Sequence, residues 1–256
     1  MSQSKAYWAI IDGWTMTLRS IKRIFRDIES LLMGILLPII VMLLFVYVFG
    51  GAIQTGTEYV NYVVPGVIIT CMGFGSSMIA ALVAQDMTGG LFDRLRSMPV
   101  LPSSLMVGHV IGSFVRNVLA TTIAFIVALL LGFRPEAGFL EWLGVIGVLS
   151  LFLLALNWLF IVFGLFVKTV ETAYAITFPM LFLPYLSSAF VPTQTMPAWL
   201  QVVAENQPMT PLIETLRGLL LGTPIDNNLW LTILWFGGLL VVSIALVTIL
   251  FNRRKS

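Results

Sequence analysis

The stretch WLGVIGVLSLFLLALNWLFIVFGLFV at residues 142–167 decides the fold class, because it contains no Asp, Glu, Lys or Arg. A helix of about 20 apolar residues crosses the hydrocarbon core of a bilayer, so this stretch predicts a transmembrane helix. The whole chain has the same character: 59% of its 256 residues are hydrophobic and 10% are charged, whereas a soluble domain carries about 25% charged residues. A water-soluble monomer is excluded, since the chain lacks the polar residues to cover itself.

Six apolar stretches are long enough to be membrane spans: residues 31–50, 59–84, a run that ends at 133 and begins between 105 and 117, 142–167, 173–191 and 229–251. The first follows a long charged segment and lacks a small-residue cleavage pattern, so we interpret it as a span and not as a signal peptide. We expect Arg116, in the third helix, to lie near the inner headgroups with its aliphatic stem snorkelling. The predicted fold is an all-α integral membrane domain over residues 30–256, without room for a soluble catalytic domain.

The charges predict an orientation with both termini in the cytoplasm. In that arrangement 12 of the 14 basic residues lie on the inner side, namely Lys5, Arg19, Lys22, Arg23, Arg26, Arg94, Arg96, Arg116, Lys168, Arg253, Arg254 and Lys255. Arg134 and Arg217 lie outside, and the 12 acidic residues divide evenly between the two sides. Because basic residues concentrate in cytoplasmic loops, this distribution predicts a multi-pass protein of the cell membrane with an N-in, C-in topology.

Residues 1–29, ahead of the first span, form a periodic segment. Apolar residues recur there at spacings of three and four, namely Tyr7, Ile11, Trp14, Leu18, Ile21, Phe25 and Ile28. Basic side chains fall largely off this stripe, which predicts an amphipathic helix at the inner leaflet, attracted by anionic lipid. The alternative is an ordinary linker that happens to be periodic.

The outer segment between the fifth and sixth spans contains two short apolar pieces, residues 198–204 and 212–221, which cannot cross a bilayer. Pro197 and Pro211 fit first helical turns, Thr210 can cap the second piece, and Gly222 follows its end. We expect two short re-entrant helices over about 193–222 in the outer leaflet. Such backbone is stable when it is buried against protein or lines a wet cavity, so the segment is predicted to form an outer mouth or lid.

The predicted spans lack the groups of side chains that ion-coupled transport, metal binding or hydrolysis would require. No Asp or Glu lies in the middle of a predicted span, which disfavours a proton- or sodium-coupled carrier. The chain has a single cysteine, Cys71, and a single histidine, His109, which are too few for a metal site. We expect Cys71 to be a small buried apolar residue and His109 to be hydrogen-bonded or solvated. Ser76 and Ser77 lack a plausible base for hydrolysis. The run around Lys168 departs from a phosphate loop, so we expect no catalytic residue, metal or cofactor on this chain.

Prolines inside spans bend helices. Pro38, Pro179 and Pro184 are such positions. Each proline either forms a functional hinge or only gives its helix a fixed bend. Around the pair in the fifth span, a possible pathway lining is formed by Phe182, Tyr185, Ser187 and Ser188. The aromatic members could stack on a planar drug or anchor the helix at the membrane interface.

The loop QDMTGGLFDRLRSMPVLPSS at residues 85–104 gathers charges on the inner side. Apolar side chains lie between its acids and arginines, and Pro99 and Pro102 end any helix there. A short charged helix with apolar knobs is a docking surface, and the alternative is a solvated loop with incidental charges.

This loop and the outer stretch SSAFVPTQTMPAWLQVVAENQPMTPLIETLRGLLLG at 187–222 resemble the type 2 ABC transporter permeases, closest to the daunorubicin-resistance permease subfamily. The resemblance covers the whole chain, from the amphipathic start through six spans, and includes the Pro65–Gly66 pair in the second. It implies a permease that exports amphipathic drugs, lipids or polysaccharides. It also implies a separate ATP-binding subunit that binds ATP and Mg, usually as two permeases with two ATPases.

The resemblance also implies roles for particular residues. A coupling helix over about 86–100 would contact the ATPase through Asp86, Gly90, Asp93, Arg94, Arg96 and Pro99, with a lesser contact at Lys168 and Glu171. The outer re-entrant gate would use Pro192, Met196, Pro197, Trp199, Pro208, Thr210, Pro211 and Arg217. The expected partners are the ATP-binding subunit, a second permease copy and membrane lipid, but not nucleic acid. A non-transporting scaffold or sensor docked to an ATPase is the alternative function.

Overall fold

The computed structural model describes residues 28–53, 58–89 and 103–253, and all its regular elements are helical. In chain order they are α2 (Ile28–Leu43), η1 (Leu44–Phe49), α3 (Tyr59–Thr88), α5 (Ser103–Leu130), α6 (Phe139–Phe166), α7 (Val170–Phe182), η2 (Leu183–Leu186), η3 (Thr193–Thr195), α8 (Ala198–Asn206), α9 (Met209–Leu221) and α10 (Asn228–Arg253). The all-α expectation is confirmed for this part of the chain. The predicted amphipathic helix falls almost entirely outside the described residues.

Four helices, α3, α5, α6 and α10, are long and apolar enough to cross a membrane. The first and fifth predicted spans correspond to shorter apolar helices, Gly34–Phe49 and Val170–Leu186. The fifth was expected to run to residue 191, but α7 ends at Phe182 and a 3-10 turn follows. Pro184 explains this early end, because proline has no N–H for the helical hydrogen bond and its ring crowds the preceding turn.

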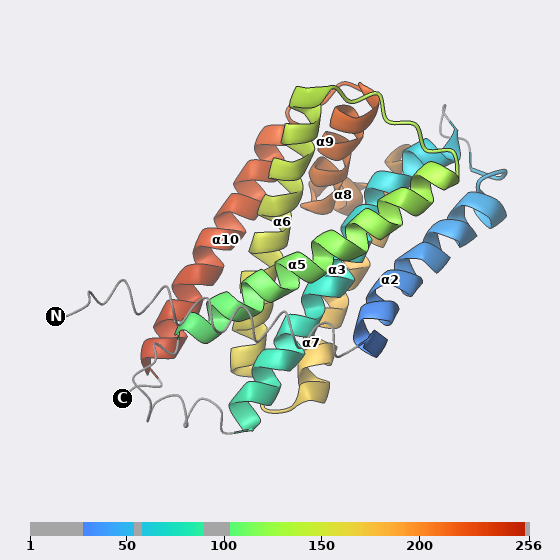
Figure 1. Cartoon of the computed structure of the whole chain (residues 1–256). Helices are drawn as coiled ribbons and strands as arrows, with labels where there is room; N and C mark the ends of the chain where they lie inside the picture. Colours follow the sequence, from blue (N-terminus) through green and yellow to red (C-terminus); the bar gives the residue numbers. More distant parts are fainter. Residues whose placement is uncertain (1–27, 54–57, 90–102, 254–256) are drawn as a thin grey trace.

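Helix α3 is the centre of the bundle (Figure 1). It packs against α2, α5, α6, α7 and α9, and 83% of its most apolar 18-residue window is buried. In contrast, α10 packs on α6 and α9 with 17% of its window buried, so most of its apolar surface faces outward. An outward apolar surface of this kind suits contact with lipid. Both helices are therefore apolar in sequence, α3 because protein surrounds it and α10 because its outer surface suits lipid.

Close helix packing depends on small residues, as is usual in membranes. A Cβ atom on Gly164 of α6 would lie 2.7 Å from the carbonyl oxygen of Ala80 and 2.8 Å from Cβ of Val83, both in α3. At Gly66, a Cβ would lie 2.6 Å from Cβ of Ala189. These glycines let α6 and the segment after η2 approach α3 directly.

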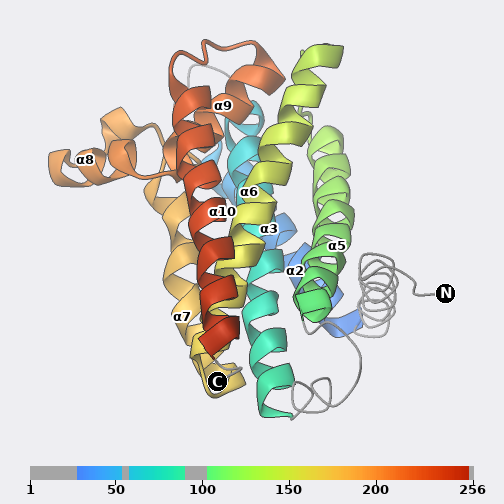
Figure 2. The ribbon, with the colours of Figure 1, turned by 90° about the vertical axis from the view of Figure 1, so that its left-hand side faces the viewer.

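The two ends of the bundle differ in architecture (Figures 1 and 2). Helices α8 and α9 and the α5–α6 connection lie at one end, here called the α8–α9 end. The other end is here called the opposite end. Helices α3, α6 and α10 end there, and helices α5 and α7 begin there. Figure 2 shows α8 projecting sideways from the bundle, and its Trp199 side chain is 71% exposed.

Candidate functional site

A buried arginine organises the α8–α9 end. Arg217, in α9, is 6% exposed and donates hydrogen bonds through Nη2 to the carbonyl oxygens of Tyr62 (3.1 Å) and Ser188 (2.9 Å). Its Nη1 pairs with Glu214 one helical turn earlier. The guanidinium carbon lies 3.8 Å from the centroid of the Tyr62 ring. One side chain therefore joins α9 to α3 and to the segment after η2, by charge-assisted hydrogen bonds and a cation–π contact.

Polar side chains near the α8–α9 junction satisfy the broken backbone after α7. Gln207 donates through Nε2 to the carbonyl oxygens of Leu183 (3.0 Å) and Leu186 (2.9 Å). Thr210 accepts a hydrogen bond from the backbone N–H of Ser188 at 3.4 Å and donates to the carbonyl of Ala204. Irregular backbone at membrane depth requires such internal partners, so these contacts make the segment suitable for a membrane environment.

The predicted gate residues occupy the short elements at this end. Pro192 and Met196 flank η3, Pro197 and Pro208 immediately precede α8 and α9, and Pro211 lies in the first turn of α9. The expectation that Thr210 caps α9 is wrong, because Pro208 is the cap residue and the Thr210 hydroxyl bonds to Ala204. Gly222 does end α9, with φ of 70°, the left-handed conformation that suits glycine.

A polar cavity of about 570 Å³ opens beside Arg217. It is lined by Asn61, Tyr62, Arg134, Glu136, Ser188, Pro192, Thr193, Gln194, Glu214, Arg217, Leu221, Thr223, Pro224 and Asp226. These residues come from the start of α3, the α5–α6 connection, the stretch from Ser188 into η3, α9 and the segment after α9. The sequence did not reveal that Arg134 and Arg217 line one cavity, since the lining residues come from segments that are far apart along the chain.

The four predicted pathway residues do not share one environment. Phe182 is 47% exposed on α7, while Tyr185 stacks on Phe190 with ring centroids 4.9 Å apart. Ser187 is buried and donates to the carbonyl of Pro184, so it stabilises the turn. Ser188 is also buried, but it lines the polar cavity.

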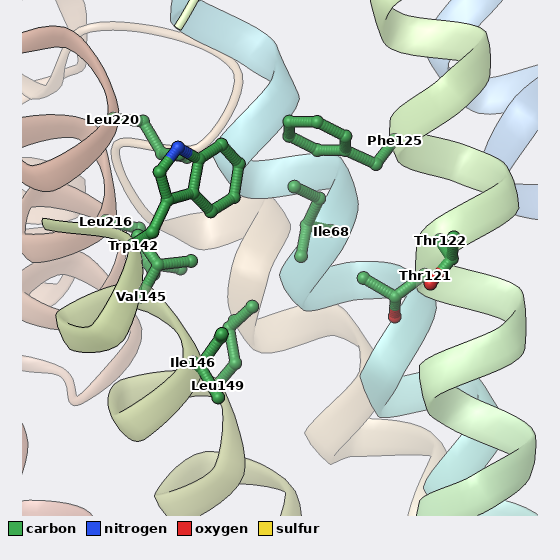
Figure 3. A pocket seen from close by; sticks show the side chains of 10 residues that line it. All are labelled: Ile68, Thr121, Thr122, Phe125, Trp142, Val145, Ile146, Leu149, Leu216 and Leu220. Carbon is green, nitrogen blue, oxygen red and sulfur yellow. The ribbon is translucent and has the colours of Figure 1, made fainter. Parts of the chain in front are cut away.

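A second pocket, of about 190 Å³, lies among α3, α5, α6 and α9 and is almost wholly apolar (Figure 3). Phe125 of α5 and Trp142 of α6 meet edge to face, with centroids 5.4 Å apart, and Ile68 of α3 lies between the two helices. Thr121 adds a hydroxyl to the α5 side. This lining suits hydrocarbon and not a charged group.

At the opposite end, an acid and a histidine meet inside the protein. Oδ2 of Asp86 lies 2.8 Å from Nε2 of His109, and the two residues are 7% and 6% exposed. Asp86 belongs to α3, which continues past the expected end at residue 84 to Thr88. It therefore does not lie on an exposed docking helix. His109 is a satisfied histidine, as expected, although the carboxylate that satisfies it was not foreseen.

The other predicted coupling residues fall into two groups. Gly90, Asp93, Arg94, Arg96 and Pro99 lie outside the described residues. Lys168 lies in the α6–α7 connection and Glu171 in the first turn of α7, and both are exposed. Exposed charges at the end of the bundle from which segment 90–102 departs are accessible to a partner.

A row of polar side chains follows the buried face of α5. Ser113 donates to Oδ1 of Asn157 in α6 at 3.1 Å, and Asn117 donates to Oγ of Ser113 at 3.1 Å. Arg116 is 8% exposed and donates to the carbonyl of Gly75 in α3, so the expectation that it snorkels to the headgroups is wrong. Polar residues recurring at spacings of three and four from His109 onward were the sequence signal for this buried face.

Comparison with known proteins agrees with this architecture. A model of the ABC-2 type transporter family matches residues 12–221. The daunorubicin resistance ABC transporter permease protein DrrB1 of Streptomyces coeruleorubidus is 30% identical over 227 residues, which cover 87% of this chain and 79% of that protein. The probable doxorubicin resistance ABC transporter permease protein DrrC of Mycobacterium tuberculosis is 25% identical over the whole chain and 93% of its own length.

The chain belongs to the ABC-2 type transporter family. Within that family it is homologous to permeases of drug-resistance ABC transporters. The apolar helices of the bundle are accordingly those of a multi-pass membrane permease.

Proposed function

We propose that this chain is the permease subunit of an ATP-driven exporter that moves a hydrophobic or amphipathic substrate outward, such as a drug, antibiotic, lipid or glycan-lipid. ATP and Mg bind to a separate ATP-binding subunit, and two permeases assemble with two such subunits. Family membership and the names of the relatives, which are resistance permeases, support this function.

The observation that carries the proposal is the difference between the two ends of the bundle. The opposite end has exposed Lys168 and Glu171, and segment 90–102 leaves it from α3 and returns to it at α5. That segment contains Arg94 and Arg96 and is the proposed docking surface for the ATPase. The alternating signs of charge at this end favour recognition of a charged protein groove.

The α8–α9 end is the proposed outer gate. Its helices are too short to span, and carbonyl oxygens of η2, of the segment after it and of α8 are satisfied by Gln207, Arg217 and Thr210. This is the condition under which re-entrant backbone is stable in a membrane. With six spans and both termini in the cytoplasm, the positive-inside rule assigns this end to the outer side of the cell membrane.

Exposed aromatic side chains on the helices support the proposed substrate class. Phe178 and Phe182 on α7 are 58% and 47% exposed, with ring centroids 4.7 Å apart. Tyr185 continues this aromatic run toward the α8–α9 end at 5.9 Å from Phe182. Aromatic faces of this kind accept planar apolar molecules better than ions or sugars.

Transport in inside-out vesicles tests the function. The vesicles contain the permease and its ATP-binding subunit, and the readout is ATP-dependent accumulation of fluorescent amphipathic drugs such as doxorubicin. The matched control is the same complex with the catalytic carboxylate of the ATPase neutralised. Accumulation that requires both ATP and the intact ATPase supports an exporter.

A different result identifies the alternative function. If the permease binds the ATPase and alters its hydrolysis, but no amphipathic drug or fluorescent lipid accumulates, the chain is a scaffold or sensor subunit and the exporter proposal is wrong. If the ATPase neither binds nor responds, the proposed coupling itself is wrong.

A further inference from the structure

The pair formed by Asp86 and His109 lies inside the bundle, close to its opposite end. Both side chains are more than nine-tenths buried, and their nearest atoms are 2.8 Å apart. Burying such groups costs several kcal/mol per ion if they are charged, and it is sustained when they are hydrogen-bonded to each other. Ionisable residues inside helical membrane bundles are expensive and are commonly functional.

The position of the pair in the chain is specific. Asp86 lies in the last turn of α3, which ends at Thr88, and His109 lies in the second turn of α5, which begins at Ser103. These two helices are the covalent attachments of segment 90–102. The pair therefore bonds the two attachments of the docking segment directly to each other, inside the bundle.

Helix α5 carries further bonds from this point into the interior. Arg116 bonds to the Gly75 carbonyl of α3, and Ser113 bonds to Asn157 of α6 at 3.1 Å. A displacement of the first turns of α5 would thus act on both α3 and α6. The Asp86–His109 contact is the first of these side-chain bonds from the docking end.

We propose that Asp86 and His109 are positioning residues for ATPase coupling. Their bond fixes the separation of the α3 end and the α5 start, so that movement of the docking segment displaces both helices together. Asp86 acts from inside the protein and does not contact the ATPase. The inference rests on the proposed function in that segment 90–102 docks the ATPase.

The first experiment measures the geometry without any partner. Spin labels are placed at Thr88→Cys and Val107→Cys, two exposed positions beside the pair, in a Cys71→Ala background that removes the single native cysteine. The protein with the intact pair should give one narrow spin–spin distance distribution. Asp86→Ala and His109→Ala should each broaden this distribution. The same distribution in all three proteins would show that the bond does not fix the separation of the α3 end and the α5 start.

The second experiment measures coupling in the full complex with the ATPase. Asp86→Ala and His109→Ala should reduce drug-stimulated ATP hydrolysis per folded complex by about fivefold or more, the usual size of a coupling effect. Bound ATPase should remain, because the docking surface is intact. Asp86→Glu should recover most of the stimulation, as should the exchanged pair Asp86→His with His109→Asp.

Thr232→Val is the matched control. Thr232 is fully buried and its hydroxyl lies 3.3 Å from that of Thr215, so this variant also loses an interhelical bond, but at the other end of the bundle. It should leave stimulation unchanged. If Thr232→Val lowers stimulation as much as Asp86→Ala, or if the exchanged pair folds but stays uncoupled, the role is structural and the proposal is wrong.

The two proposals fail in different ways. If the proposed function is wrong, vesicles with the native-pair permease and its ATPase accumulate no drug, while the spin-label distances still respond to Asp86→Ala. If the positioning role is wrong, the permease couples normally and Asp86→Ala leaves both readouts unchanged.

Discussion

The guanidinium carbon of Arg217 lies 3.8 Å from the ring centroid of Tyr62, and the same arginine bonds to the carbonyl oxygen of that residue. The two residues are 155 positions apart in the sequence. The contact joins the short helix α9 to the central helix α3. This buried cation therefore helps to fix the α8–α9 end to the bundle, together with apolar packing and the hydrogen bonds of Gln207 and Thr210.

Arg217→Met should lower the free energy of unfolding by about 2–5 kcal/mol, because it leaves two buried carbonyl groups without their donor. Thermal unfolding followed by fluorescence-detected size exclusion measures the loss. Arg217→Lys should recover only part of it, since an ammonium group cannot replace the planar fork. Arg134→Met, at an exposed arginine that also bonds to backbone carbonyls, is the control and should lose far less. Equal losses at both positions would contradict the role of Arg217.

Gly164→Ala should destabilise the bundle by about 1–3 kcal/mol, the usual cost of overpacking. The new Cβ would lie 2.7 Å from the Ala80 carbonyl oxygen, which belongs to the backbone and cannot swing away. Gly147→Ala in the same helix is the matched control, because no heavy atom lies within 4 Å of its Cβ position. It should be neutral or should raise the melting temperature, since alanine favours helix by about 1 kcal/mol. A stabilising Gly164→Ala would show that α3 and α6 do not pack this closely.

Cysteine labelling in whole cells should report the orientation. Cys71 is buried, so the native protein should react little with a membrane-impermeant maleimide. Glu136→Cys, at an exposed acid of the α5–α6 connection, should react from outside. Glu171→Cys, at an exposed acid of the opposite end, should react only after the cells are permeabilised. The reverse pattern would place both termini outside.

Arg94→Glu with Arg96→Glu should abolish permease-stimulated ATP hydrolysis and export, because reversed charges repel the surface that accepts the native ones. Co-purification of the ATPase should fall in parallel and should depend on salt concentration. Lys168→Glu, the lesser contact, should have a smaller effect. Survival of both activities in the double variant would exclude docking through this segment.

The sequence predicted the elements whose causes are local. Gly222 ends α9 as expected, because a left-handed residue after a helix is a local requirement that glycine meets. The runs of apolar residues located α3, α5, α6 and α10 to within a few residues, apart from the start of α5 and the extension of α3 to Thr88. The surroundings of the site residues are harder to predict from the sequence. The sequence places Asp86 on an exposed docking helix and Arg116 near the headgroups, yet both are buried. Their surroundings come from other helices, which periodicity along one helix does not reveal.

By itself, the sequence determined that this chain is an α-helical membrane protein and where most of its helices lie, because the bilayer imposes length and hydropathy on each span separately. The tertiary structure decided which polar side chains meet: Arg217 with Tyr62 and Ser188, Asp86 with His109, and Ser113 with Asn157. Lipid gives all apolar helices nearly the same environment, so their order and rotation are set by small residues and interhelical hydrogen bonds. Those contacts form only when the helices assemble.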